Sequence, residues 1–171
     1  MIIAITGPAG SGKTTVAEKL AKELKKIVNI DADHIKHMNP GAFAKVTDKD
    51  GNEDWPYSAW GLVGENIAIL AENFMSHGYD VIINGWLEVE AWKEIEKRIK
   101  LDHKLLLLPD EDTNILRDDG RTDEVKMGEL AVKRGRKYFD SEPYYSDFIK
   151  LDTSSETIEQ TVTRIKVLLT K

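Results

Sequence analysis

Short apolar runs alternate along the chain with longer segments in which apolar residues recur every three to four positions. The short runs are rich in isoleucine, valine and leucine, as expected for strands that are buried on both faces. They lie at 2–6, 27–30, 80–84, 104–108 and 148–151. The longer segments predict amphipathic helices at about 14–26, 62–77, 88–100, 113–118 and 124–139, followed by a last helix that ends near 169. Strands separated by helices imply parallel crossovers, so the pattern predicts a layered α/β fold.

The residues between these segments indicate where elements begin and end. The stretch from about 39 to 57 holds Gly, Pro, Asp and Asn without a clear period, so we expect mostly loop there. Gly78 stands where a glycine commonly ends a helix. Thr153 and Glu156 have capping-box spacing, which predicts that the last helix opens there. We find no repeat or linker, so residues 1–171 are expected to form a single domain.

Charge and composition narrow the classes of function. The 171 residues include 24 Lys and Arg against 30 Asp and Glu, and the net charge of −6 argues against binding long nucleic acid. The absence of cysteine excludes disulfides, cysteine-bound zinc and a thiol nucleophile. No apolar run approaches the roughly 18 residues that span a bilayer, so we expect no membrane association. The amino terminus also lacks the basic region of a signal peptide, and we expect a cytoplasmic protein.

The segment at 7–14 carries the strongest chemical signal. It matches G-x-x-x-x-G-K-[ST] in full, directly after a predicted strand and before a predicted helix. Glycines allow turns that bring backbone N–H groups around a phosphate, and the helix amino end also favours an anion. In this motif the Lys13 ammonium reaches the β- and γ-phosphates and the Thr14 hydroxyl ligates Mg²⁺. We therefore expect ATP and Mg²⁺ as cofactors, with candidate nucleotide contacts at Gly7, Ala9, Gly10, Ser11, Gly12, Lys13, Thr14 and Thr15.

Two absences distinguish this chain from other nucleotide-binding classes. A GTPase carries an Asn-Lys-x-Asp guanine signature, which the sequence lacks. The third predicted strand ends in Asn84-Gly85 and not in an acidic residue, which counts against a motor ATPase.

The chain resembles the small-molecule and nucleotide kinase branch of P-loop proteins. The likeness is to predicted kinases that include chloramphenicol phosphotransferase-like, shikimate, gluconate and zeta-toxin kinases. It rests on the loop at 7–14, on Asp-Ala-Asp-His-Ile at 31–35, on an arginine-rich segment and on Leu-Asp-Thr-Ser at 151–154. The resemblance implies a three-layer α/β/α fold with a five-stranded parallel sheet in the order 2-3-1-4-5 and a short lid. It also implies that the backbone near 152–155 borders the adenine.

Two acidic residues follow the second strand, at the sheet edge where ligands of open parallel sheets bind. Phosphoryl transfer to an alcohol needs a group that orients and deprotonates the attacking hydroxyl. By the resemblance, Asp33 is the base, and Asp31 is a candidate to hold Mg²⁺, with a bridging water as the expected arrangement. The alternative is that one of the two carboxylates only caps the following helix.

Arginines after the fourth strand are candidates for contact with the transferred phosphoryl group. Planar guanidinium donors stabilise the charge that develops there. The resemblance places such arginines on a mobile lid, at about 110–137, and Arg117 and Arg121 occupy the matching positions with Gly120 between them. We therefore count Lys13, Arg117 and Arg121 with Asp33 as candidate catalytic residues. The alternative is an ordinary solvated, charged surface.

The region after the second strand, at about 34–62, is expected by resemblance to bind the acceptor. Aromatic walls there would stack on a ring or a sugar face. The candidate acceptor contacts are Asp33, Trp55, Trp60, Asn84 and Trp86. The alternative is that the tryptophans pack in the core, since Trp is usually well buried.

The leading hypothesis is an ATP- and Mg²⁺-dependent kinase that phosphorylates a hydroxyl of a small-molecule acceptor. A nucleoside or nucleotide kinase on the same scaffold, and a regulatory nucleotide-binding protein without an acceptor, are the alternatives. Between 38 and 97 the basic side chains are only Lys45, Lys49, His77, Lys93 and Lys97, which disfavours a nucleotide acceptor. The sequence does not indicate an oligomeric state.

Overall fold

Five parallel strands form the centre of the computed structural model, which describes residues 1–39, 46–47, 53–54, 57–122 and 126–170. The strands run in the order β2-β5-β1-β6-β7. Their bounds are β1 Ile2–Thr6, β2 Ile27–Asp31, β5 Asp80–Asn84, β6 His103–Leu107 and β7 Ile149–Leu151. Counted along the chain, this is the predicted order 2-3-1-4-5, and the predicted three-layer α/β/α fold is confirmed.

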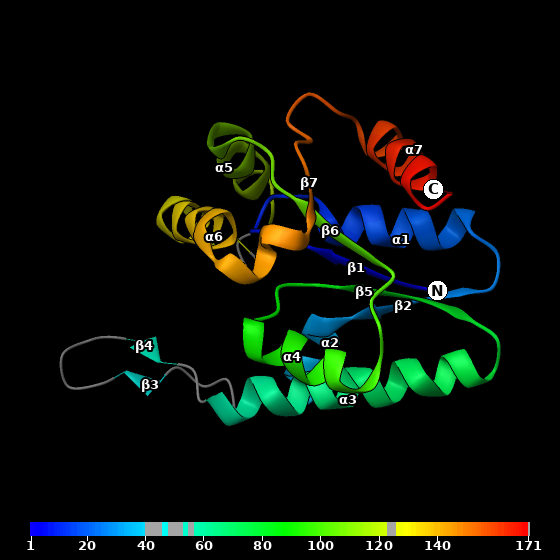
Figure 1. The fold of residues 1–171 in the computed structure, drawn as a ribbon. Helices are drawn as coiled ribbons and strands as arrows, with labels where there is room; N and C mark the ends of the chain where they lie inside the picture. The colour runs from blue at the N-terminus through cyan, green and yellow to red at the C-terminus, as the bar shows by residue number, and fades with distance from the viewer. Residues whose placement is uncertain (40–45, 48–52, 55–56, 123–125, 171) are drawn as a thin grey trace.

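The helices cover both faces of this sheet (Figure 1). Their bounds are α1 Lys13–Glu23, α2 Ala32–His37, α3 Tyr57–Ser76, α4 Val89–Arg98, α5 Glu111–Asp119, α6 Glu129–Ser141 and α7 Ile158–Leu168, with a 3-10 helix η2 at Pro143–Asp147. Helices α1 and α7 lie on one face and α3 and α4 on the other, while α5 and α6 stand near the carboxyl ends of the strands. Within the described ranges, no helix has the length and apolar character that crossing a membrane requires.

The central strand β1 shows why its sequence is apolar without interruption. Ile2 and Ala4 pack in the core on the α3 and α4 side, whereas Ile3 and Ile5 pack in the core with α1 and α7. All four side chains are fully buried. Because successive residues of a strand point to opposite faces, a strand covered on both sides needs apolar residues at every position. Burial of each isoleucine contributes about 1.5–3 kcal/mol.

The predicted start of the last helix is wrong. Helix α7 begins at Ile158, with Thr157 as its cap and Gln160 closing the capping box. The Thr157 hydroxyl accepts from the Gln160 N–H, and the Gln160 side chain accepts from the Thr157 N–H. The segment at 153–156 has the same residue pattern, but Thr153 is buried and Arg117 donates to it. Two consecutive cap patterns follow β7, and the tertiary contacts of the first one leave the second to cap the helix.

Other boundaries also differ from the prediction. Helix α3 begins at Tyr57, five residues before the predicted start, and α6 begins at Glu129, five residues after it. Helix α2 is missing from the predicted helix ranges, although the capping alternative for Asp31 and Asp33 assumes a helix directly after them. Within the predicted loop, two short strands, β3 (Val46–Thr47) and β4 (Glu53–Asp54), pair in antiparallel fashion.

Strand register brings the candidate chemistry to one edge. Asp31 at the end of β2 pairs with Asn84 at the end of β5, and Asn84 pairs with Ile5 near the end of β1. Segments that are separated by about 25 residues or more in the sequence therefore meet at the carboxyl edge of the sheet.

Candidate active site

The loop between β1 and α1 has the geometry of an anion cradle. Gly12 lies in the left-handed region at the start of α1, where no side chain caps the helix. The first helical hydrogen bond runs from the Val16 N–H to the Gly12 carbonyl at 2.9 Å. The backbone N–H groups that precede Val16 therefore have no partner within the helix. Together with the helix dipole, they form a site for a phosphate.

Two features of the structure require a glycine at position 10. Its φ of +74° is rarely adopted by L residues. A Cβ at this position would also come within 2.2 Å of the Asn114 carbonyl oxygen of α5. The loop is thus pressed against α5, and the glycine spacing of the motif reflects a close approach between two backbones.

Several charged side chains act on the ammonium group of Lys13. Its Nζ donates to the Pro8 carbonyl oxygen at 3.4 Å. Burial lowers the pKa of the Lys13 ammonium below its ordinary value. The carboxylate of Asp33 is the strongest charge acting on this pKa and raises it, while Arg121 lowers it and Asp31 raises it. These side chains come from α1, α2, the segment after α5 and β2, and their charges all act on the ammonium group of Lys13.

The two acids after β2 have different positions. Asp31 is the cap of α2, because its Oδ1 accepts the Asp33 N–H at 2.9 Å. Burial raises the pKa of the Asp31 carboxyl. Asp33 lies in the first turn of α2, half-buried, and its carboxylate acts on Lys13. Asp31 is therefore the residue that caps the helix. Its second carboxylate oxygen can still bind a further ligand.

Oxygen donors suitable for Mg²⁺ are present at this edge. The Thr14 hydroxyl lies in the first turn of α1, and Asp31 is a hard oxygen ligand. Among the described residues there is no cluster of three or more His, Asp or Glu side chains that would hold a metal by itself. This donor set fits Mg²⁺ bound together with nucleotide phosphates, since Mg²⁺ is usually held by one or two protein groups and the phosphates.

The two candidate lid arginines are separated by the structure. Arg121 donates from Nη1 to Asp118 Oδ1 at 3.3 Å, is exposed, and acts on Lys13. Arg117 instead donates to the Thr153 carbonyl oxygen at 2.8 Å and to its hydroxyl at 3.3 Å. Arg117 therefore joins α5 to the loop before α7, the loop predicted to border the adenine.

The candidate acceptor residues that the structure describes lie in different environments. Trp60 is 5% exposed and belongs to the hydrophobic core. Asn84 is fully buried, and its Nδ2 donates to Asn29 Oδ1 at 2.8 Å. Trp86 stacks on Tyr138 of α6 with ring centroids 5.9 Å apart. Trp55 lies outside the described residues. Trp60 and Trp86 therefore pack against other side chains, as the alternative to an acceptor role predicts.

Sequence reasoning missed two buried polar residues on α5. Asn114 and Asp118 are the side chains that this helix buries, with exposures of 0% and 1%. Asn114 donates from Nδ2 to the Ala9 carbonyl oxygen of the phosphate loop at 2.7 Å. Leu116, between them, is 73% exposed. An amphipathic helix is expected to bury its leucine and expose its polar residues. In the sequence, only the i, i+4 spacing of Asn114 and Asp118 indicates that the two share a face of the helix.

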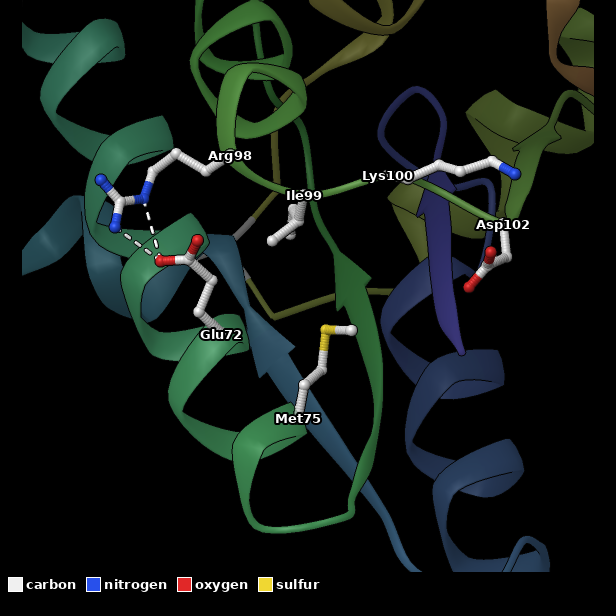
Figure 2. A pocket seen from close by; sticks show the side chains of 6 residues that line it. All are labelled: Glu72, Met75, Arg98, Ile99, Lys100 and Asp102. Atoms are coloured by element: carbon white, nitrogen blue, oxygen red, sulfur yellow. Dashed lines mark hydrogen bonds and ion pairs between the residues drawn. The ribbon is translucent and has the colours of Figure 1, made fainter.

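A pocket, shown in Figure 2, lies toward the amino ends of the strands. It has a volume of about 420 Å³ and is lined by Glu72, Met75, Arg98, Ile99, Lys100 and Asp102. Arg98 is paired with Glu72 at 2.6 Å. Asp102 accepts the Ile2 N–H at 2.7 Å at the amino end of β1, whereas the phosphate loop follows its carboxyl end. This pocket is thus separate from the phosphate loop.

The sheet order, the phosphate loop and the helical layers define the class of this chain as a P-loop kinase fold, and solved structures share it. A tunicamycin resistance protein from Deinococcus radiodurans superposes with a TM-score of 0.70 at 12% identity, covering 99% of this chain and 95% of that one. A Janibacter sugar kinase gives 0.70 at 21% identity, covering 99% and 94%. Shikimate kinase from Acinetobacter baumannii, in complex with shikimate, gives 0.64 at 18% identity, covering 99% and 92%.

The family is shown by the sequence itself. The Zeta toxin family model matches residues 1–106, more than half of the chain, and the chain belongs to the Zeta toxin family. The match includes the phosphate loop, both acids after β2 and the end of β5. It ends within β6, before the lid arginines.

Proposed function

We propose that this protein is an ATP- and Mg²⁺-dependent kinase that transfers the γ-phosphoryl group to a hydroxyl of a small-molecule acceptor. One observation carries the proposal: the carboxylates of Asp33 and Asp31 and the guanidinium of Arg121 all act electrostatically on Lys13, the residue that opens α1 directly after the phosphate loop. A carboxylate base, a phosphate-binding ammonium and a guanidinium are the groups that phosphoryl transfer to an alcohol requires.

Each residue has a defined role in the proposed reaction. Asp33 orients the acceptor hydroxyl and takes its proton as the oxygen attacks phosphorus. Lys13 and Arg121 stabilise the negative charge on the phosphoryl oxygens. Thr14 and Asp31 would hold Mg²⁺, which supplies charge neutralisation on the phosphates when bound. Arg117 binds Thr153 through Nη1 and Nη2, and its proposed role is to order the loop expected to border the adenine.

The proposal includes the organisation of the chain and the class of acceptor. Residues 1–171 would act as one kinase domain, with an acceptor region at about 34–62 and a lid at about 110–137. The carboxylates of Asp31 and Asp33 repel an anionic acceptor, and few cations lie between 38 and 97. An uncharged, hydroxyl-bearing acceptor is therefore favoured over a nucleoside monophosphate.

The test is ADP release from Mg·ATP in the presence of an acceptor panel. The panel contains antibiotics, sugars, sugar acids, shikimate, nucleosides, monophosphates and 5′-hydroxyl oligonucleotides. Lys13→Met and Asp33→Asn are the test variants. Asp140→Asn is the matched control, because it removes an exposed carboxylate of α6 that pairs with Lys150.

We expect release that is stimulated by at least one uncharged acceptor and that needs both Lys13 and Asp33 but not Asp140. The phosphorylated product, identified by mass spectrometry, names the acceptor. Release that is indifferent to every acceptor and to Asp33 would overturn the proposal in favour of a regulatory nucleotide-binding protein. Stimulation by monophosphates alone would favour a nucleotide kinase.

A further inference from the structure

Helix α5 buries a carboxylate in the lid region. Asp118, near the carboxyl end of α5, is 1% exposed. Carboxylates are almost never buried to this degree unless they are paired or hydrogen-bonded. The partners of Asp118 therefore indicate what it holds in place.

Asp118 binds two parts of the lid with its two oxygens. Oδ2 accepts the Met127 N–H at 3.0 Å and the Gly128 N–H at 2.9 Å. Oδ1 accepts from Arg121 Nη1 at 3.3 Å. Gly128 is the cap residue of α6, which has no side-chain cap of its own. The carboxylate of α5 thus satisfies backbone donors at the start of α6 and also binds the lid arginine.

The opposite end of this arrangement is anchored to the phosphate loop. Asn114, one helical turn before Asp118, donates to the Ala9 carbonyl oxygen at 2.7 Å. The Asn114 backbone also lies so close to Gly10 that a side chain there would collide with it. Asp118 is therefore held at a defined place relative to the loop that faces the phosphates.

The arginine that Asp118 holds still has donors for a ligand. A guanidinium carries five N–H donors, and the Asp118 bond uses one nitrogen. The side chain is 40% exposed and close enough to Lys13 to lower its pKa. One nitrogen of Arg121 is thus held by Asp118, while its charge acts on Lys13 at the end of the phosphate loop.

We propose that Asp118 is a positioning residue for phosphoryl transfer, which holds Arg121 and the start of α6 over the phosphate loop. This inference rests on the proposed function for its effect on turnover. Its effect on the order of the lid does not depend on that function.

Asp118→Asn is the sharpest variant, because it keeps the shape of the side chain. Its NH₂ group must replace one carboxylate oxygen, so a donor would then face either Arg121 or the two backbone N–H groups. Asp119→Asn is the matched control. Asp119 is the adjacent carboxylate, exposed, and paired with Lys126 at 2.7 Å.

The first measurement is amide hydrogen exchange of the full chain without ligand. We expect peptides that cover 126–132 to exchange at least about tenfold faster in Asp118→Asn than in the wild type, because local opening becomes easier. Asp119→Asn is expected to match the wild type. Equal exchange in the two variants would overturn the proposed hold on the lid, whether or not the protein is a kinase.

The second measurement is turnover with the best acceptor. We expect kcat to fall by about 10- to 100-fold in Asp118→Asn, since small misplacements of an aligned group have effects of this size. The Kd for Mg·ATP should change by less than about threefold. In an Arg121→Ala background, Asp118→Asn should lower kcat by no more than about twofold further.

These outcomes separate a positioning role from general destabilisation. Additive losses in the double variant would show that Asp118 acts independently of Arg121, and would overturn the positioning role. A wild-type protein that turns over no acceptor would overturn the proposed function, and amide exchange would then decide the role of Asp118 alone.

Discussion

Helices α2 and α5 occupy corresponding places on the two sides of the site, but they are held in different ways. Each follows a strand and is capped by an aspartate: Asp31 accepts the Asp33 N–H, and Asp110 accepts the Thr113 N–H. Helix α5 has nine residues and buries two polar side chains that bind other segments. Helix α2 has six residues and buries only Ala32.

This difference distinguishes the phosphate-loop side of the candidate site from the side that carries the candidate base. On the phosphate-loop side, backbone contacts and buried hydrogen bonds join α5 to the phosphate loop and to the start of α6. On the acceptor side, the candidate base stands on a short helix whose cap bond is internal to it. The phosphate loop is thus held by contacts with two other segments, whereas the candidate base Asp33 is half-buried on a short helix.

The largest effect is expected from Lys13→Met, which removes the charge that both sides share. Turnover should fall by at least about 10³-fold, because a preorganised cation on the transferred group is lost. Acceptor-dependent ADP release measures it, and circular dichroism checks the fold. Turnover within tenfold of the wild type would show that the two sides do not meet at Lys13.

Asp33→Asn tests the acceptor side alone. We expect phosphoryl transfer to fall by about 10²- to 10³-fold, the contribution of a general base. The Kd for Mg·ATP should stay within about threefold of the wild-type value, because the residue does not belong to the phosphate loop. Calorimetric titration with a non-hydrolysable ATP analogue checks this. A large loss of ATP affinity would place Asp33 on the phosphate side of the comparison.

Gly10→Ala tests how tightly the phosphate side is packed. The new Cβ would meet the Asn114 carbonyl oxygen at 2.2 Å in a left-handed backbone conformation. Strain and overpacking together are expected to lower the free energy of unfolding by about 2–5 kcal/mol. Urea denaturation measures this value.

Gly128→Ala is the control for Gly10→Ala. Gly128 also has a positive φ, of +82°, but an added Cβ there meets no described atom within 4 Å. We expect a cost of about 1–3 kcal/mol, from the backbone conformation alone. Equal costs at the two positions would show that the contact between the loop and α5 adds nothing to stability.

The smallest effect is expected from Asp31→Asn, read as a function of pH. Burial raises the pKa of Asp31 in the folded state, so the folded protein holds this proton more tightly than the unfolded chain. The charged carboxylate therefore lowers stability as the pH rises through its pKa range. The asparagine keeps an oxygen to cap α2 without this cost.

Melting temperatures of the wild type and Asp31→Asn between pH 4 and pH 7 test this expectation. The variant should gain stability relative to the wild type as the pH rises. A difference that does not change with pH would mean that the Asp31 carboxylate is as well solvated in the folded state as in the unfolded chain.

Much of the fold was predictable because period and spacing are local properties. The apolar run at 2–6 requires burial on both faces, and the loop at 7–14 requires glycines at fixed positions. Element boundaries were less predictable. The cap at Thr157 lies four residues after a similar pattern at Thr153, whose residues bind other partners: Arg117 donates to Thr153, and Thr161 and Arg164 donate to Glu156.

The sequence by itself determined the class of fold, the phosphate loop and the acids at the end of β2, because each depends on residues close together in the chain. The tertiary structure alone decided which polar groups are buried. Asp118 is enclosed while Leu116 of the same helix is exposed. Its partners are the backbone N–H groups of Met127 and Gly128, directly before α6, and the side chain of Arg121, and a buried carboxylate is stable only where such donors converge in space.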